Sequence, residues 1–322
     1  MSMKKWTLFL SLYFCLCLLS ACGGAFSAAS PAEQPSEPFA AAADPGAAAP
    51  SLAEDEEPAV LTCRIVDGAE TGGLLLAELD GGMGVYRLDL LADTELEAAV
   101  PEKPRPTPIP VHLDGKPAAL SDLEDGMTVD IFFNGAVEEI FPARPGEVYQ
   151  VEGHSIGTEK NPGGSCYDLC GLYLQVLDDL WQKDPGLNEN IALAGLDLST
   201  APGGLTDSEK AALAWRFGEL HGVEVLTGTF EELEEQGYFT AGPLGEGAPE
   251  GAVFVRWEDG CLFSIKPNEG HEGEVYAGLP VLFFDAEKWR SSLGAYCFYD
   301  CSAVWPERGT WSGYQIGSEM IS

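Results

Sequence analysis

The sequence predicts an α+β protein, in which a small β domain precedes a domain of helices and strands. Three observations support this fold class. Short apolar runs separated by turn dipeptides fill residues 59–152, with no helical period among them. An apolar stripe with helical spacing extends from Leu169 to Trp181. Strand-like pairs follow the helices toward the C-terminal end, so we expect a mostly antiparallel sheet with covering helices.

Residues 1–21 have the layout of an export signal. Lys4 and Lys5 give a positive start, and an apolar run from Trp6 to Leu18 is followed by small residues. The run is shorter than the roughly twenty residues that span a bilayer. We therefore expect this segment to be a signal peptide that is removed during export.

Leu19-Ser20-Ala21-Cys22 resembles the lipobox of bacterial lipoproteins. The resemblance implies cleavage before Cys22 and attachment of diacylglycerol to its thiol, so that Cys22 is the lipidated N-terminus. Several acyl chains give stable anchoring where one is marginal. The expected location is the extracytoplasmic face of the cell membrane. An ordinary secretory signal that happens to contain cysteines is the alternative.

Residues 22–58 are dominated by Ala, Pro, Ser, Gly and Glu and have no apolar period. Such a composition cannot bury enough apolar surface to offset the entropy of ordering the chain. We expect a disordered tether that holds the folded part away from the membrane.

The charge of the chain excludes one class of partner. The net charge is -35, and it becomes -37 (15 basic against 52 acidic residues) when Lys4 and Lys5 leave with the signal. Non-specific nucleic-acid binding depends on Lys and Arg, so nucleic acid is not expected as a partner. Anionic lipids would also repel this surface, so membrane attachment must come from the lipid anchor.

Residues 59–152 predict a small β domain. The stretch Leu120–Gly135, with the following Glu138–Ala143, resembles an OB-like domain of unknown function from envelope lipoproteins of Gram-positive bacteria. The resemblance implies a closed or nearly closed barrel and an envelope setting, and it names no activity. Asn134-Gly135, between two apolar runs, predicts a hairpin. The expected strands are Val60–Val66, Leu74–Leu79, Val85–Leu91, Ile109–Leu113, Met127–Phe133 and Val137–Phe141.

Residues 153–322 predict the α+β domain. Thr206 with Glu209, and Thr229 with Glu232, are capping-box pairs that predict two helices after the one at 169–181. A short helix from Asp285 to Leu293 is also expected. The expected strands are Ile191–Leu198, Val223–Leu226, Phe254–Trp257 paired with Cys261–Ile265, Val281–Phe284, and Tyr296–Trp305 paired with Trp311–Ile316. Residues 289–322 resemble uncharacterised lipoproteins of Firmicutes.

Two cysteine pairs are candidates for disulfides or for a metal site. Cys166 and Cys170 are four residues apart on a predicted helix, and Cys297 and Cys301 are four apart on a predicted strand. Each spacing places a pair on one face of its element. A four-thiolate zinc site is disfavoured because helical partners lie about 6 Å apart and strand partners about 13 Å apart. Disulfides and buried thiols remain as alternatives.

No catalytic constellation is expected from the titratable residues. The four histidines (112, 154, 221 and 271) are scattered, and His221 is expected at a helix C-terminus. Asp197 and Asp300 interrupt apolar strands, and a glycosidase would need such carboxylates about 5 to 9.5 Å apart. Strand-end or capping roles are favoured for both.

The sequence therefore predicts a lipid-anchored envelope protein that acts by non-catalytic binding or scaffolding, without cofactor or bound metal. Its expected partners are the membrane, through the anchor, and a cell-wall component or envelope protein. Two alternatives stay open. One is a hydrolase of wall or host glycans that uses paired carboxylates such as Asp197 and Asp300, and the other is a thiol-redox or metal-handling module built on the four cysteines.

Overall fold

A computed structural model describes residues 57–90, 108–155, 157–158, 168–243, 253–268, 270–271, 275–276, 278–304, 311 and 313–322. The predicted signal peptide, the lipidation site Cys22, nearly all of the predicted tether and Cys166 lie outside these residues. Residues 48–322 form one compact unit. In the part of the chain that the structure describes, no helix has the length and apolar character needed to cross a membrane.

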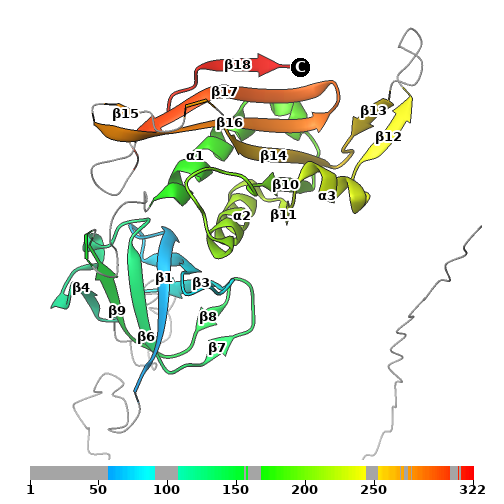
Figure 1. The fold of residues 1–322 in the computed structure, drawn as a ribbon. Helices are drawn as coiled ribbons and strands as arrows, with labels where there is room; N and C mark the ends of the chain where they lie inside the picture. The colour runs from blue at the N-terminus through cyan, green and yellow to red at the C-terminus, as the bar shows by residue number, and fades with distance from the viewer. Residues whose placement is uncertain are drawn as a thin grey trace, which may run out of the picture. The chain divides into compact units, whose positions relative to one another are not determined.

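The chain is an α+β protein whose strands form two large sheets (Figure 1). The seven-stranded sheet has the order β3-β2-β1-β6-β9-β4-β5, and a separate hairpin joins β7 to β8. Neither sheet closes into a barrel among the described residues. The strands of this region are β1 (Ala59–Asp67), β2 (Gly73–Glu78), β3 (Val85–Asp89), β4 (Val111–Leu113), β5 (Lys116–Pro117), β6 (Thr128–Phe133), β7 (Val137–Glu138), β8 (Arg144–Pro145) and β9 (Val148–His154).

Local sequence explains much of this sheet. Asp114 and Gly115 both have positive φ (50° and 77°) and join β4 to β5 as a tight two-residue turn. In β2, Leu74 and Leu76 enter the core of the seven-stranded sheet, whereas Leu75 and Ala77 join the cluster formed with α1 and α2. The apolar run of β2 is therefore buried on both faces.

The hairpin expected at Asn134-Gly135 does not form. β6 pairs with β1 and β9, and β7 pairs with β8 instead of returning along β6. Both edges of β6 are thus already hydrogen-bonded, which leaves no place for a following strand. Ile140 and Phe141 of the displaced segment are 52% and 64% exposed.

The described residues of the second region form three α-helices and a nine-stranded sheet. The predicted helices are confirmed at α1 (Leu169–Gln182), α2 (Asp207–His221) and α3 (Phe230–Glu235), and both capping boxes are present. The strands are β10 (Leu193–Asp197), β11 (Glu224–Thr227), β12 (Thr240–Pro243), β13 (Val253–Arg256), β14 (Gly260–Pro267), β15 (Val275–Tyr276), β16 (Leu279–Ser291), β17 (Gly294–Val304) and β18 (Ser318–Ile321). Short 3₁₀ turns occur at Leu120–Asp122 and Pro185–Asn188.

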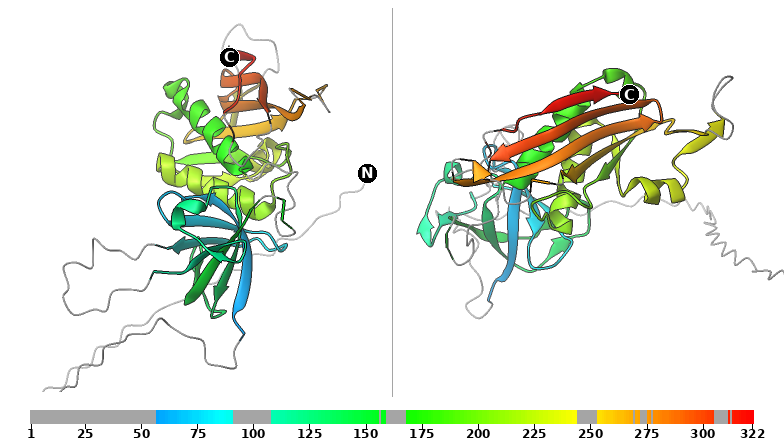
Figure 2. Two further views of the ribbon diagram at one scale, coloured as in Figure 1. Left: turned by 90° about the vertical axis from the view of Figure 1, so that its left-hand side faces the viewer. Right: turned by 45° about the horizontal axis from the view of Figure 1, so that its top comes forward.

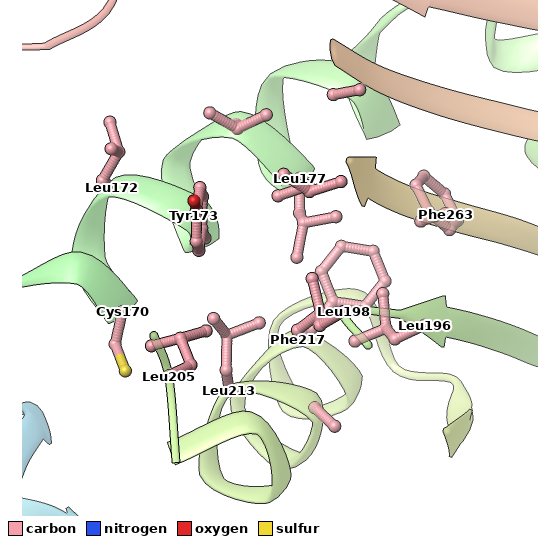
Figure 3. Close-up of a cluster of buried hydrophobic side chains, with 14 of the residues drawn as sticks. Cys170, Leu172, Tyr173, Leu177, Leu196, Leu198, Leu205, Leu213, Phe217 and Phe263 are labelled. Carbon is pink, nitrogen blue, oxygen red and sulfur yellow. The ribbon is translucent and has the colours of Figure 1, made fainter. Parts of the chain in front are cut away.

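The sheet is mostly antiparallel, but β10 pairs in parallel with both β11 and β14. The antiparallel strands β16, β17 and β18 lie side by side (Figure 2). One face packs on α1 and α2, where Tyr173, Leu177, Leu213 and Phe217 meet Leu196 and Phe263 from the sheet and Leu198 just after β10 (Figure 3). Leu233 of α3 packs with Trp257 and Leu262 in a separate cluster. Helices therefore contribute to two distinct cores.

The short helix expected from Asp285 is wrong, because residues 279–291 form one continuous strand, β16. Leu282, Phe284, Ala286 and Lys288 alternate on its buried face. The Lys288 ammonium is fully buried and donates to carbonyl oxygens of Trp181 and Asp184, and also of Lys183, at the C-terminal end of α1. Lys288, which was expected on a helix, is thus an inward-facing residue of β16.

The hairpin expected around Glu258-Asp259-Gly260 is also wrong. β13 pairs with β12 and β16, whereas β14 pairs with β10 and β16. The buried Trp257 indole lies against Gly260, where an added Cβ would come within 2.1 Å of the ring. The chain therefore bends over this indole instead of folding back on itself.

Helix α2 also contacts the seven-stranded sheet. Arg64 Nε of β1 lies 2.7 Å from Glu209 Oε1, and the Ser208 hydroxyl donates to the Glu78 carbonyl oxygen at 2.5 Å. Arg216 Nε lies 2.5 Å from Asp67 Oδ2. Two ion pairs therefore join α2 to β1, and one hydrogen bond joins it to β2.

Candidate functional site

The structure places three of the four candidate cysteines, on α1 and β17. Cys170 is buried in the first turn of α1, and Cys297 and Cys301 are buried in β17. Asp300, with φ 52°, forms a bulge between them, where Phe284 pairs with Cys301 and Ala286 with Phe298. Cys301 consequently enters the main core, and Cys297 does not. The expectation that Cys297 and Cys301 share one face is wrong, because the extra residue changes the alternation.

The thiols of β17 are poorly suited to redox chemistry. Burial, with nearby Asp285 and Asp300, raises the pKa of the Cys301 thiol to about 12. Burial also raises the pKa of Cys297. The reactive form of cysteine is the thiolate, which a raised pKa suppresses. Within the described residues, no cluster of His, Cys, Asp and Glu has the geometry to hold a metal ion.

Asp197 and Asp300 do not form a carboxylate pair. Asp197 ends β10 and Asp300 lies in β17, and β14 and β16 separate these two strands in the sheet. Three steps of about 4.8 Å place the strands roughly 14 Å apart, which exceeds the separation in a glycosidase. Asp300 instead accepts a hydrogen bond from Asn268 Nδ2 at 3.0 Å, and Asn268 also donates to Asp285 at 2.9 Å.

The surroundings of His221 and His154 indicate structural and not catalytic roles. His221 is the last residue of α2, as expected, and its ring stacks on Trp181 with centroids 4.1 Å apart. Burial lowers its pKa. His154 Nε2 lies 3.0 Å from Asp130 Oδ2, and the other Asp130 oxygen accepts from the Thr62 hydroxyl at 2.7 Å. The threonine thus donates to the aspartate and not to the histidine, which is not the order of a nucleophile, base and orienting acid.

A hollow of the described surface lies between α2 and β11. Its volume is about 660 Å³. Its helical wall carries small residues at Ala211, Ala214 and Gly218, spaced three or four residues apart along α2, and Gly222 follows at the C-cap. We call this hollow the α2–β11 groove. Its other lining residues are Phe141, Trp215, Glu219, Val223, Glu224, Val225 and Thr227.

Local sequence brings helix and strand together here. Gly222 adopts φ 66° and ends α2, so the chain turns directly into β11. At Gly218 an added Cβ would lie 2.9 Å from the Val223 carbonyl oxygen and 3.1 Å from Val225 Cγ2. The glycine therefore allows α2 to approach the strand closely.

Among the described residues, β11 is an edge strand, and one of its sides is open. The amides of Glu224 and Gly228 donate to Ala192 and Leu196 of the β10 segment, both at 3.1 Å. In a parallel ladder the intervening residues direct their N–H and C=O groups away from the neighbouring strand. The backbone groups of Val225 and Thr227 therefore face the open side, which borders the α2–β11 groove.

A smaller hollow of about 240 Å³ adjoins the groove at Thr227, which lines both. We call it the acidic hollow, because Asp197, Asp207 and Glu232 line it together with Lys210. It lies at the carboxyl ends of the parallel strands β10 and β11, the position where open α/β sheets bind ligands. Asp197 is buried there and accepts from the Ser199 hydroxyl at 2.6 Å and the Ser199 amide at 3.1 Å.

The strand-end position of Asp197 was predicted from the sequence, whereas the groove was not. The small residues Ala211, Ala214 and Gly218 were a usable signal, because they recur at helical spacing along α2. The edge position of β11 was not predictable, because it depends on which strand pairs with β10 on each side. Comparison of the chain with protein-family models, with curated proteins and with solved structures finds no match in any of the three.

Proposed function

We propose that this chain is a lipid-anchored binding protein of the cell envelope, and that the α2–β11 groove is its binding surface. The observation that carries the proposal is the open side of β11 beside an apolar helical wall. Ligand sites are typically concave and mostly apolar, with a few polar groups that fix orientation. The groove has this character, since Trp215, Val223 and Val225 line it beside the free backbone groups of the strand.

The anchor and the domain organisation of the proposal derive from the sequence. The lipobox at Leu19–Cys22 supports attachment to the extracytoplasmic face of the membrane, and the composition of residues 22–58 supports a tether. An OB-like origin for residues 59–152 is part of the proposal, supported by the resemblance of Leu120–Gly135. The partner is an envelope or cell-wall component within reach of the tether.

Photo-cross-linking in intact cells tests the proposed surface. A photoreactive phenylalanine derivative replaces Trp215 in the anchored chain, and the matched control carries it at Leu293, an apolar residue that is 67% exposed on another part of the chain. We expect a discrete adduct from position 215 and none from position 293. Ala211→Trp, which fills the groove, should abolish the adduct at position 215. Equal adducts from both positions, or an adduct that survives Ala211→Trp, would contradict the proposal.

A further inference from the structure

The backbone of β11 indicates what kind of ligand the groove takes. The open side of the strand presents the N–H and C=O groups of Val225 and Thr227, and no described residue bonds to them. An extended polypeptide supplies donors and acceptors at the matching spacing, as in strand addition to a sheet edge. A sugar or lipid lacks this regular alternation. This inference rests on the groove being the binding surface and specifies its occupant.

The groove also selects side chains. In an added strand, successive side chains point to opposite faces. The side chains on one face would lie against the small residues of α2, where Ala211 and Gly218 leave room and Trp215 forms a wall. Alternate apolar side chains therefore fit this wall, and the other side chains point away from it.

The charges around the groove indicate the remaining side chains. Glu219 and Glu224 are the charged residues that line the groove, and both are exposed. The acidic hollow adds three carboxylates and one ammonium, so the two hollows together carry five negative charges and one positive charge, a net of -4. Arg87 lies 6.0 Å from the Trp215 ring centroid and is 4.0 Å from Asp89, a pairing that offsets its charge.

A second copy of the chain is a poor occupant. Each copy carries a net charge of -35. In a dimer, the acidic residues around the groove of one copy would face the acidic surface of the other copy. Like charges brought together at an interface oppose association. A ligand of opposite charge gains from the same field.

We propose that the α2–β11 groove binds an extended, basic polypeptide segment, which adds as a strand to the open side of β11. Alternate apolar side chains pack on α2, and Lys or Arg side chains face Glu219, Glu224 and the acidic hollow. The acidic hollow, at the carboxyl end of β11, receives the cationic group that lies nearest Thr227.

Short acetylated peptides test the proposal with the full chain in detergent. The probe alternates Val and Lys. One control replaces Lys with Glu, and the other replaces Val with Ser. We expect binding of the Val–Lys peptide, measured by calorimetry, with affinity at least about tenfold above either control and decreasing as salt is added. Equal affinity for the Val–Glu peptide would overturn the charge assignment.

Two variants of the chain separate the backbone from the charges. Val225→Pro removes an amide that faces the open side, a position where edge strands tolerate proline, and Val225→Thr is its matched control. We expect Val225→Pro to lose binding and Val225→Thr, which keeps the amide, to lose much less affinity, with unchanged circular dichroism for both. The double variant Glu219→Lys, Glu224→Lys changes two exposed residues and leaves the core intact. We expect it to bind the Val–Lys peptide with about a tenfold lower affinity.

The outcomes distinguish this inference from the proposed function. Binding of the Val–Lys peptide that is unaffected by both sets of variants overturns the strand-addition site. If position 215 cross-links specifically to a glycan or lipid, and the peptide does not bind, the groove remains the binding surface and the polypeptide assignment is wrong. If position 215 gives no specific adduct and the peptide does not bind, both proposals fail.

Discussion

At the scale of single residues, a buried ion pair fastens α2 to the seven-stranded sheet. The side chains of Arg64 and Glu209 are only 16% and 7% exposed, and Arg64 also donates to the Gly126 carbonyl oxygen at 2.9 Å. Removing one partner of a buried pair leaves the other charge without compensation, which costs more than an exposed pair contributes. The contact is therefore a sensitive reporter of how α2 is held.

Arg64→Met is expected to lower the free energy of unfolding by about 3 kcal/mol, because Glu209 stays buried without its guanidinium. The matched control is Arg256→Met, which removes an ion pair to Glu258 whose side chains are 51% and 52% exposed. We expect less than about 1 kcal/mol for the control. Urea unfolding of both variants measures the difference, and equal losses would contradict the structural assignment.

Asp168 gives the stability of the chain a pH dependence. It caps α1 by accepting from the Gly171 amide at 3.2 Å. Burial, and then the charge of Asp125, raise the pKa of Asp168 from 3.8 to about 7. The folded chain therefore holds this proton more tightly than the unfolded chain, so its contribution to the free energy of unfolding is present below about pH 4 and is lost as the pH rises toward 7.

Asp168→Asn is expected to remove this dependence while keeping a capping side chain. Between about pH 4 and pH 7, the unfolding free energy of the original chain should fall relative to that of the variant by a few kcal/mol, at most about 1.4 kcal/mol per pH unit. Urea unfolding at a series of pH values measures both curves. Parallel curves would show that Asp168 ionises normally in the folded chain.

At the scale of elements, Gly195 of β10 shows how tightly the sheet meets the aromatic cluster beside α3. An added Cβ would lie 2.9 Å from atoms of Leu233, Trp257 and Leu262. Gly195→Ala is expected to lower the free energy of unfolding by about 1 to 3 kcal/mol through overpacking. Gly242→Ala in β12, where no atom lies within 4 Å of the added Cβ, is the control and should change it little. Chemical denaturation compares the two, and similar losses would count against tight packing at Gly195.

Elements with local signals were predictable from the sequence. The helix at α1 followed from its apolar stripe, and α2 and α3 from the capping boxes of Thr206 and Thr229. These signals succeed because helix caps are satisfied within a few residues of chain. For the candidate site, only the local feature was predictable. Asp197 was recognised as a strand-end residue, but the residues that join it in the acidic hollow were not.

Elements whose identity depends on distant partners were not predictable. Residues 285–293 were predicted to form a short helix, but β14 and β17 supply hydrogen bonds along both sides of β16 and make residues 279–291 one strand. The bulge at Asp300 likewise depends on pairing with Phe284 and Ala286. Local propensity is overridden in these places by ladder hydrogen bonds and burial that no short stretch of sequence records.

At the scale of the whole molecule, the two sheets share one apolar core across β2. Leu75 and Ala77 contribute to the same cluster as α1 and α2, and Ser208 and Arg216 of α2 bond to β2 and to Asp67 of β1. A change in either region therefore reaches α2, and with it the helical wall of the α2–β11 groove. The predicted boundary at residues 152–153 remains a prediction about chain organisation.

The anchor is tested at this scale by Cys22→Ser. Serine lacks the thiol that receives the lipid, so we expect the variant to leave the membrane fraction or to keep its signal peptide. Ser20→Ala, which keeps a small residue beside the cysteine, should partition like the original chain. Mass spectrometry of the first residue of the mature protein measures acylation directly. Acyl-free mature protein in the membrane fraction would contradict the lipid anchor.

The open side of β11 is the feature from which the binding account follows, and residue-resolved amide hydrogen exchange tests it most directly. The full chain is compared with and without the Val–Lys peptide at saturating concentration. We predict that the amides of Val225 and Thr227 become strongly protected, whereas those of Glu224 and Leu226, which face β10, change little. Unchanged exchange at Val225 and Thr227, or protection confined to another part of the chain, would contradict the account.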